Sequence, residues 1–331
     1  MTRYARQICL PEVGNAGQAA IRAAHVLVVG AGGLGSPVMQ YLVAAGVGRL
    51  TLVDGDVVSL SNLQRQTLFR EADVGKAKVV VAAQSLRALN SDCEIEAIEV
   101  ALDPANALTF VGQSTLVLDC ADNFAISYIL SDCCKALAVP LISASVLGLA
   151  GYVGGFCDTA PSLRAVFPGL PDRMETCETA GVMGPVVGII GAAQAQMALA
   201  HLIGQTPSPL GQLIRIDMHN FRSSGFRFDA APDPEADLTF IAASEVRSCD
   251  FVVELRDTEE AETPVVVSAR RLTVAQFSEQ RPSPAENQRA VFACRSGLRA
   301  WQAATHLRSY WDGEITLIAM GDTPPTESQP I

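Results

Sequence analysis

Short apolar runs alternate with longer amphipathic stretches through the first two thirds of the sequence. The runs are rich in Val, Leu and Ile, and most are followed by a turn and then by apolar residues at helical spacing. Because strands that are apolar on both faces need cover on both sides, this alternation predicts an α/β fold with a doubly wound, mostly parallel, Rossmann-like sheet. The expected strands cover 24–30, 49–54, 93–99, 115–120 and 140–146, and the expected helices cover 36–46, 75–90 and 124–138.

Two further apolar runs, at 149–156 and 213–218, are expected to be strands with one long helix, 184–204, between them. This helix is the most apolar stretch, but it contains a proline, two glutamines and a histidine, so a buried helix is favoured over a membrane span. Residues 1–20 are expected to form an arm whose polar start shows no secretory signal. We therefore expect a cytoplasmic protein that does not bind membranes.

The acidic residues are concentrated in one part of the chain. Of the net charge of −11, the 11 acids and two arginines between residues 229 and 262 contribute −9. The remainder has no basic stripe, so nucleic-acid binding is not expected. The Pro-, Ala- and acid-rich sequence that opens this segment is typical of a linker. We expect domains at 1–228 and 241–320, a linker at 229–240 and a flexible tail at 321–331.

A glycine-rich turn follows the first expected strand and opens the first helix. Gly30, Gly32 and Gly35 satisfy the pattern G-x-G-x-x-G, with Gly33 inside it, and Asp54 ends the second strand. Glycines let the backbone approach phosphates, and the helix N-terminus favours negative charge. The pattern predicts a bound nucleotide whose ribose is hydrogen-bonded by Asp54.

Further charged residues favour an ATP-cleaving enzyme over a nicotinamide dehydrogenase. Arg65 and Lys78 are expected to hold the β and γ phosphates, and Asp122 is expected to hold a Mg²⁺ ion that bridges phosphate oxygens. A dehydrogenase would leave these two cations unexplained. Four polar residues nearby are further candidate nucleotide contacts: Ser61, Asn62, Gln64 and Asn123.

Each of these residues also has a purely structural interpretation. Asp54 and Asp122 are the kinds of residue that cap turns, and Arg65 has Glu71 and Asp73 nearby as ion-pair partners. Lys78 is compatible with a helix surface, as Lys76 is. Packing of polar loop residues is an alternative for Asn62 and Gln64.

Several motifs occur in one order along residues 1–228. They are RYARQ at 3–7, the glycine loop, SNLQRQ at 61–66, DCADN at 119–123 and CETAGVMGP at 177–185. In these motifs the chain resembles the ThiF/MoeB/HesA family, the bacterial relatives of ubiquitin-activating enzymes. The resemblance implies ATP-dependent adenylylation of the C-terminal glycine carboxylate of a small ubiquitin-fold sulfur-carrier protein that ends in Gly-Gly. Pyrophosphate would be released, and the carrier would be ThiS-like or MoaD-like, in thiamine or molybdopterin biosynthesis.

The same resemblance assigns roles to residues outside the nucleotide loop. Arg6 matches an arginine that reaches ATP from the neighbouring subunit, which implies a homodimer. Cys177 matches the crossover-loop cysteine, which in some members forms a persulfide or thioester link and in others is idle. Relatives with structural zinc carry two C-x-x-C pairs, but here 162–165 reads SLRA and 221–226 reads FRSSGF. No zinc is therefore expected.

A second candidate for sulfur chemistry lies near the end of the chain. The nine cysteines contain no C-x-x-C pair, and five of them, Cys93, Cys120, Cys133, Cys134 and Cys157, lie in or beside apolar runs and are expected to be inert. Cys294 instead follows a strand-like run and opens CRSGLR, which resembles the active loop of rhodanese-like sulfurtransferases. Three departures leave open whether it is active or belongs to a degenerate docking domain. About 80 residues is short for that family, Glu254 stands where an aspartate is expected, and the usual His-Ile-Pro-Gly-Ala segment is unrecognisable.

Two hypotheses follow from these patterns. The first is an adenylyltransferase for a sulfur carrier, with a persulfide-donating sulfurtransferase as a further partner and a secondary sulfurtransferase activity at Cys294. The second is a non-catalytic or sulfur-handling adaptor that docks the carrier while Cys294 accepts sulfane sulfur. Arg65, Lys78 and Asp122 favour the first hypothesis because a docking scaffold does not need them.

Overall fold

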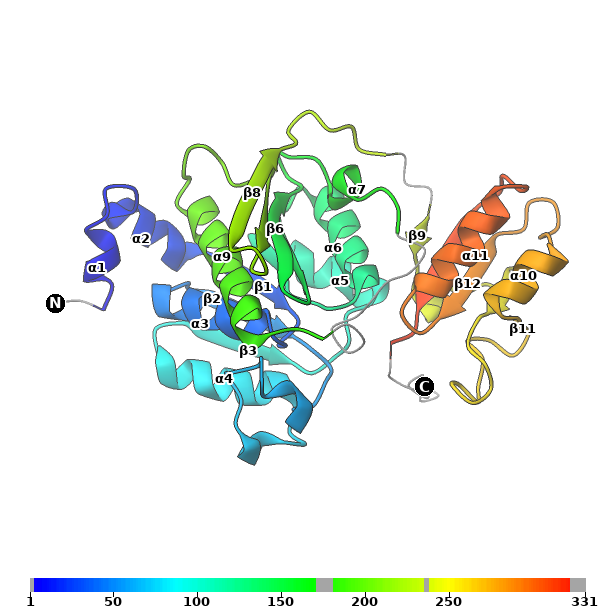
Figure 1. The fold of residues 1–331 in the computed structure, drawn as a ribbon, viewed down its shortest axis with the longest axis horizontal. Coiled ribbons are helices and arrows are strands. Elements are labelled where there is room, and N and C mark those ends of the chain that lie inside the picture. Colours follow the sequence, from blue (N-terminus) through cyan, green and yellow to red (C-terminus); the bar gives the residue numbers. More distant parts are fainter. Residues whose placement is uncertain (1–2, 171–180, 235–237, 322–331) are drawn as a thin grey trace.

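The computed structural model describes residues 3–170, 181–234 and 238–321 (Figure 1). Its first sheet has eight strands in the order β3-β2-β1-β4-β5-β6-β7-β8. The first five in this order are parallel, and β6, β7 and β8 continue the sheet as antiparallel strands. Their bounds are β1 His25–Val29, β2 Arg49–Val53, β3 Glu94–Ile98, β4 Leu116–Asp119, β5 Leu141–Leu147, β6 Ala150–Phe156, β7 Gln212–Asp217 and β8 Arg222–Arg227.

Helices cover both faces of this sheet, as the doubly apolar strands require. On one face, α3, α4 and α9 share a hydrophobic core with β1 and β2 through residues such as Val26 and Leu50. On the other face, α5 and α6 share a second core, which includes Leu27 of β1 and Val53 of β2. The helices of this part are α1 Ala5–Ile8, α2 Gly14–Ala23, α3 Gly35–Ala45, α4 Lys78–Leu89, α5 Pro104–Gly112, α6 Phe124–Leu137, α7 Leu163–Val166 and α9 Gly184–Leu202. Two 3₁₀ turns lie at Leu60–Asn62 and Glu71–Asp73.

Helix α9 is the described helix that is long and apolar enough, by length and composition, to cross a membrane. It packs against α3, β5 and β6, and half of its apolar window is buried inside the molecule. These contacts agree with the buried helix that the sequence favoured over a membrane span.

The second sheet has five parallel strands in the order β11-β10-β12-β13-β9. Helix α10, Val274–Gln280, and helix α11, Leu298–Arg308, belong to this part, which we call the second unit (residues 238–321; Figure 1). A 3₁₀ turn covers Ala243–Glu245. The strands are β9 Thr239–Phe240, β10 Phe251–Glu254, β11 Arg270–Arg271, β12 Ala290–Cys294 and β13 Ile315–Ala319.

The acidic segment after β8 differs from the predicted linker at two points. Strand β9 lies inside the range 229–240 and pairs with β13, so the second sheet begins before residue 241. Asp233 accepts a hydrogen bond from the backbone N–H of Ser162 at 2.7 Å and pairs with Lys135 at 2.6 Å. The part of this segment that the structure describes is therefore attached to the first sheet's helices instead of being fully solvated.

Candidate active site

The glycine loop closes tightly against the carboxyl end of β4. Gly30 has φ +97°, and a Cβ there would lie 2.6 Å from the carbonyl oxygen of Cys120. A Cβ on Gly35 would lie 2.1 Å from the Gly30 carbonyl oxygen, and one on Gly33 would lie 2.9 Å from a Val187 methyl. At Gly32 the nearest atom would be Gln66 Nε2 at 3.6 Å, an ordinary van der Waals distance, so a Cβ there would meet no clash. Three glycines thus shape the turn, and the packing of the protein does not by itself require the fourth.

Asp54 links the glycine loop to the turn after β2. Its carboxylate accepts hydrogen bonds from the backbone N–H of Ala31 at 2.7 Å and of Asp56 at 2.8 Å. Burial raises the pKa of Asp54, and the nearby charge of Lys78 opposes that rise. The turn-capping role that the sequence allowed is therefore present. The contact to ribose stays a prediction.

Lys78 is the first residue of α4 and is buried, with 6% of its surface exposed. Its Nζ donates a 2.7 Å hydrogen bond to the Asp56 carboxylate, and its backbone N–H donates to the Asp56 carbonyl at 2.9 Å. Lys76 has 58% of its side chain exposed and pairs with Asp73 at 3.0 Å. A buried ammonium that pairs with an exposed aspartate and acts on Asp54, which itself bonds the glycine loop, is not an ordinary surface lysine.

Arg65 runs alongside the glycine loop. Its Cγ and Cδ lie 3.5 and 3.6 Å from the position of a Cβ on Gly33, and Nη1 donates to the Ser61 carbonyl at 3.3 Å. The sequence alternative, a pair with Glu71 or Asp73, is wrong: among the described residues Arg65 has no ion pair, and Asp73 is held by Lys76 and the Arg70 N–H. The guanidinium is left without a carboxylate beside the loop.

The other polar residues of this segment have local partners. The hydroxyl groups of Ser59 and Ser61 are 2.9 Å apart, and Gln64 donates to the Val182 carbonyl at 3.5 Å. Asn62 supplies a backbone carbonyl that accepts from the N–H of residue 66. These contacts match the packing alternative for Asn62 and Gln64, and contacts of Ser61, Asn62 and Gln64 to a nucleotide stay predictions.

The carboxyl end of β4 carries one buried and one exposed acid. Asp119 is fully buried and accepts from the Ser143 hydroxyl at 2.7 Å, and burial raises its pKa. Asp122 is exposed in the following turn. Asn123 caps α6 by accepting from the Ala125 N–H at 2.9 Å, so its side-chain oxygen already has a structural role.

The side chains present are compatible with Mg²⁺ bound together with phosphates. Among the described residues no group of three or more His, Cys, Asp or Glu side chains could hold a metal ion. Mg²⁺ at phosphate sites commonly takes one or two carboxylates and completes its shell with phosphate oxygens and water. An exposed Asp122 at the edge that carries the glycine loop suits that arrangement. The expected absence of zinc stays a prediction.

Two residues at this site were missed by the sequence analysis as functional candidates. Asp56 holds Lys78, and the D-x-D spacing after β2 was the available signal. Gln66 is buried, its Oε1 has no hydrogen-bond partner among the described residues, and its Nε2 lies next to Gly32. An unpartnered buried acceptor beside a glycine loop is suited to a donor group of a bound ligand.

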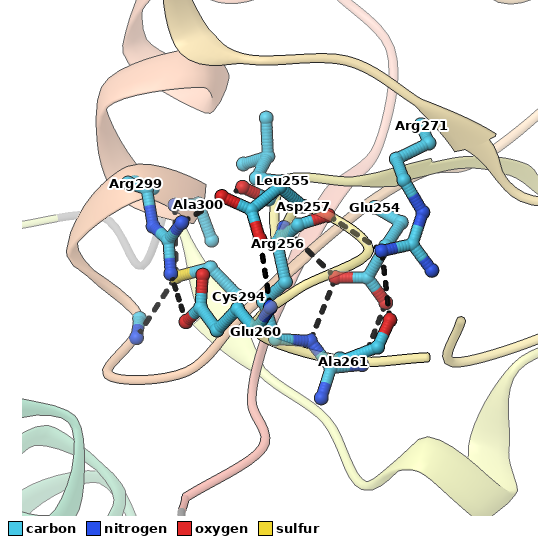
Figure 2. A network of polar contacts seen from close by, with 11 residues as sticks. Glu254, Leu255, Arg256, Asp257, Glu260, Ala261, Arg271, Cys294, Arg299 and Ala300 are labelled. Carbon is cyan, nitrogen blue, oxygen red and sulfur yellow. Dashed lines mark hydrogen bonds and ion pairs between the residues drawn. The ribbon is translucent and has the colours of Figure 1, made fainter. Parts of the chain in front are cut away.

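Cys294 ends β12 and is fully buried (Figure 2). Its sulfur accepts hydrogen bonds from the backbone N–H groups of Gly297 at 3.1 Å and Ala300 at 3.3 Å. Burial raises the pKa of this thiol, while those N–H groups and the charge of Arg299 act against the rise. The ring of backbone donors is as predicted and the charges of Arg256 and Arg299 act on the sulfur, but the thiol itself is fully buried.

The substitution at Glu254 is accommodated by a buried ion pair (Figure 2). Glu254 accepts from Arg256 at 2.7 and 2.8 Å and from the Val265 N–H at 2.9 Å. Burial alone would raise the pKa of Glu254, but these hydrogen bonds and the Arg256 charge outweigh it and lower the pKa. Arg299 donates to the Leu255 carbonyl at 2.9 Å and pairs with Glu260. The end of β10, which pairs with β12 just before Cys294, is therefore held by a network of ion pairs and hydrogen bonds.

Comparison with known proteins identifies the family. A sequence model described as the ThiF family matches residues 4–238, more than two thirds of the chain. The chain belongs to the ThiF family. This confirms the resemblance on which the sequence analysis rested.

Curated relatives of this ThiF-family chain include enzymes of two named kinds. "Adenylyltransferase and sulfurtransferase MOCS3" from Bos taurus is 48% identical over 223 residues, which cover 65% of this chain and 48% of the relative. "SAMP-activating enzyme E1" from Haloferax volcanii is 37% identical over 235 residues, which cover 70% of this chain and 87% of the relative. The chain spans about half the length of the MOCS3 relatives that it matches.

Solved structures agree with the predicted Rossmann-like class. The crystal structure of PaaA matches with a TM-score of 0.59 and 26% identity, covering 68% of this chain and 72% of that one. E. coli MccB with ATP matches with a TM-score of 0.61 and 22% identity, covering 70% and 73%. At that identity the likeness to MccB shows the fold alone.

Two predictions for this ThiF-family chain concern residues away from the glycine loop. Arg6 is exposed on α1. Close to it in the chain, the Tyr4 hydroxyl accepts a hydrogen bond from Asn90, and Gln7 donates one to the Ala45 carbonyl. Those partners lie just before β3 and β2, at the edge of the sheet opposite the glycine loop. Arg6 therefore lies away from its own chain's glycine loop, and its role at the site of a neighbouring subunit stays a prediction. Cys177 lies outside the described residues.

Proposed function

We propose that this protein adenylylates the C-terminal glycine carboxylate of a small ubiquitin-fold carrier protein, with ATP as the second substrate. The observation that carries the proposal is the convergence of the glycine loop, Asp54, buried Lys78 and Asp122 at the carboxyl ends of β1, β2 and β4. Ligands of open α/β sheets bind at that edge. Family membership, and relatives named adenylyltransferase and activating enzyme, support the same reaction.

The reaction needs charge neutralisation and alignment more than a strong base. A carboxylate oxygen attacks the α-phosphorus of ATP, the α–β bridging oxygen leaves with its electron pair on pyrophosphate, and acyl-AMP forms. Because two anions must meet, cations placed beforehand lower the barrier. Lys78 and Arg65 would bind the β and γ phosphates, and Asp54 would orient the ribose. Mg²⁺ held by Asp122 would neutralise phosphate charge when bound.

The Cys294 loop supports a second, sulfur-transferring step. Its thiol would carry a sulfane sulfur delivered by a persulfide-donating sulfurtransferase. The terminal sulfur attacks the acyl carbon and AMP leaves, which gives an acyl disulfide between the carrier and Cys294. A second thiol then attacks the Cys294 sulfur, which releases the carrier thiocarboxylate and leaves Cys294 in a disulfide. We further propose a cytoplasmic homodimer in which Arg6 serves the partner's site, with ThiS-like and MoaD-like carriers as the two candidates.

Pyrophosphate exchange tests the first step. Purified protein, ATP, Mg²⁺ and labelled pyrophosphate are incubated with a ThiS-like or a MoaD-like carrier, and label in ATP is counted. We expect exchange with one carrier, dependent on its Gly-Gly end and lost in Asp122→Ala. Protein that binds ATP but shows no exchange with either carrier would overturn the proposal and favour the adaptor.

A further inference from the structure

The second unit is attached to the first sheet's helices through an aromatic contact that we call the latch (Tyr128, Arg164 and Trp301). The rings of Tyr128, on α6, and Trp301, on α11, stack with centroids 5.4 Å apart and an interplanar angle of 19°. The Arg164 guanidinium lies 4.4 Å from the Tyr128 ring centroid and 5.9 Å from that of Trp301. All three residues are buried. The latch is therefore a packed interface.

Arg164 is fixed in the latch by charge and by the chain entering the second unit. It pairs with Asp132 through two hydrogen bonds of 2.7 and 2.8 Å, and donates to the Leu238 carbonyl at 3.1 Å. Leu238 directly precedes β9. The same guanidinium thus donates hydrogen bonds to α6 and to the first residue of the second unit, and these bonds orient the second unit relative to α6.

The latch places the Cys294 loop against the first turn of α6. A Cβ on Gly297 would lie 3.2 Å from the Ala125 Cβ and 2.8 Å from the Phe240 ring. Gly297 also donates to the Cys294 sulfur at 3.1 Å. These distances, with the two bonds between the Gly297 nitrogen and its Cβ position, keep the sulfur within about 10 Å of Ala125. Ala125 lies three residues after Asp122.

The thiol is buried in this arrangement. Cys294 has no exposed surface, and it shares one hydrophobic core with Ala125 and Tyr128 of α6 and with Trp301. A macromolecular donor cannot reach a thiol in that position. The loop that carries the thiol lies against α6 at Gly297, so movement of the second unit away from α6 would uncover this side of the loop and would break the stacking of Tyr128 and Trp301.

We propose that the latch is a positioning device with two effects: it holds the Cys294 loop beside the adenylylation site for sulfur transfer, and it excludes sulfur donors while closed. The inference rests on the proposed function, because it takes acyl-AMP as the acceptor. Tyr128, Arg164 and Trp301 act through the loop and touch no reacting atom. Opening the latch should therefore speed loading of Cys294 and slow delivery to the carrier.

The test uses the full chain with Trp301→Leu and, as a matched control, Tyr310→Leu. Tyr310 also belongs to the second unit and stacks with a cation, Arg281, at 4.4 Å, but that contact lies wholly within the unit. The rate of iodoacetamide labelling of Cys294 is followed by peptide mass spectrometry. Loss of ring stacking and of the cation–π contact should speed labelling about tenfold or more in Trp301→Leu, with little change in the control.

Activity is then measured in a single turnover from preformed acyl-AMP and persulfidated protein, with dithiothreitol as the thiol. Trp301→Leu should form thiocarboxylate about tenfold more slowly, while its pyrophosphate exchange stays within about twofold of the parent. Trp301→Phe keeps a ring and should restore both transfer and slow labelling. Labelling and transfer rates equal to those of the parent would overturn the latch.

Failure of the latch is distinguishable from failure of the proposed function. The labelling rate needs neither ATP nor carrier, so it reports the latch even if no adenylylation occurs. If Trp301→Leu does not fold, Arg164→Gln keeps the packing but loses the ion pair with Asp132. Unchanged labelling in that variant would then contradict the proposal.

Discussion

Replacing Lys78 with Met removes the buried cation beside the glycine loop while keeping an unbranched chain of similar length. Lys78 is the first residue of α4, and its ammonium pairs with the Asp56 carboxylate at 2.7 Å. In the substrate complex the ammonium would donate this hydrogen bond to a phosphate instead. A hydrogen bond to a charged group contributes about 1.5–3 kcal/mol. We therefore expect kcat/KM for pyrophosphate exchange to fall about 10- to 150-fold.

The same substitution should change the pH dependence. Lys78 opposes the rise that burial causes in the pKa of Asp54, so its removal lets that pKa rise further. If ionised Asp54 binds ribose, the acid limb of the pH profile moves to higher pH. Stability should change little, by about 0–1 kcal/mol, because the Asp56 side chain is 69% exposed and can be solvated.

Lys76→Met is the matched control, since Lys76 lies two residues earlier and is exposed. Pyrophosphate exchange at saturating carrier, measured from pH 5 to 9 for both variants, checks the argument. Activity of Lys78→Met within about twofold of Lys76→Met, with an unmoved acid limb, would refute the role of Lys78.

Three other substitutions test separate parts of the structure. Asp56→Asn should raise KM for ATP more than it lowers kcat, because it loosens Lys78 without removing it; steady-state exchange kinetics separate the two. Cys294→Ala should abolish thiocarboxylate formation, followed by intact mass of the carrier, and leave exchange unchanged. Glu254→Gln leaves Arg256 buried without its carboxylate, which should cost about 3–5 kcal/mol in urea unfolding of the second unit. The pKa of Glu254 is lower in the folded protein than in the unfolded chain, where it is about 4.3. The stabilisation by the Glu254–Arg256 pair is therefore fully present above the unfolded pKa and is lost as pH falls through the folded pKa. A stability difference independent of pH would contradict that pairing.

The elements with strong local signals were predicted well from the sequence. The strands and helices around the glycine loop agree with their predicted ranges to within a few residues, because apolar strands and the G-x-G-x-x-G turn are encoded locally. Helix α5 was missed although Asp103 caps it and Pro104 opens it. Helices α1 and α2 were expected only as an arm. Strand β9 could not be found, since a two-residue strand is defined by its partner β13 and not by its own pattern.

The candidate site was predicted as a set of residues more than as an arrangement. The glycine loop and Lys78 follow from motif and position, whereas the hold of Asp56 on Lys78 depends on a turn that brings residues 22 positions apart together. Burial of Cys294 was not predictable from its own motif, because the packing of its loop, including the contact of Gly297 with Ala125 of α6, depends on distant parts of the chain. The five cysteines expected to be inert are all buried, as predicted.

The most direct test of the central claim follows oxygen atoms. A carrier labelled with ¹⁸O in both oxygens of its C-terminal carboxylate is incubated with the protein, ATP and Mg²⁺, and hydroxylamine then cleaves any activated acyl group. Adenylylation predicts one ¹⁸O in the AMP that is released, because the attacking carboxylate oxygen stays on phosphorus. Unlabelled AMP, or ¹⁸O in inorganic phosphate formed together with ADP, would contradict the account.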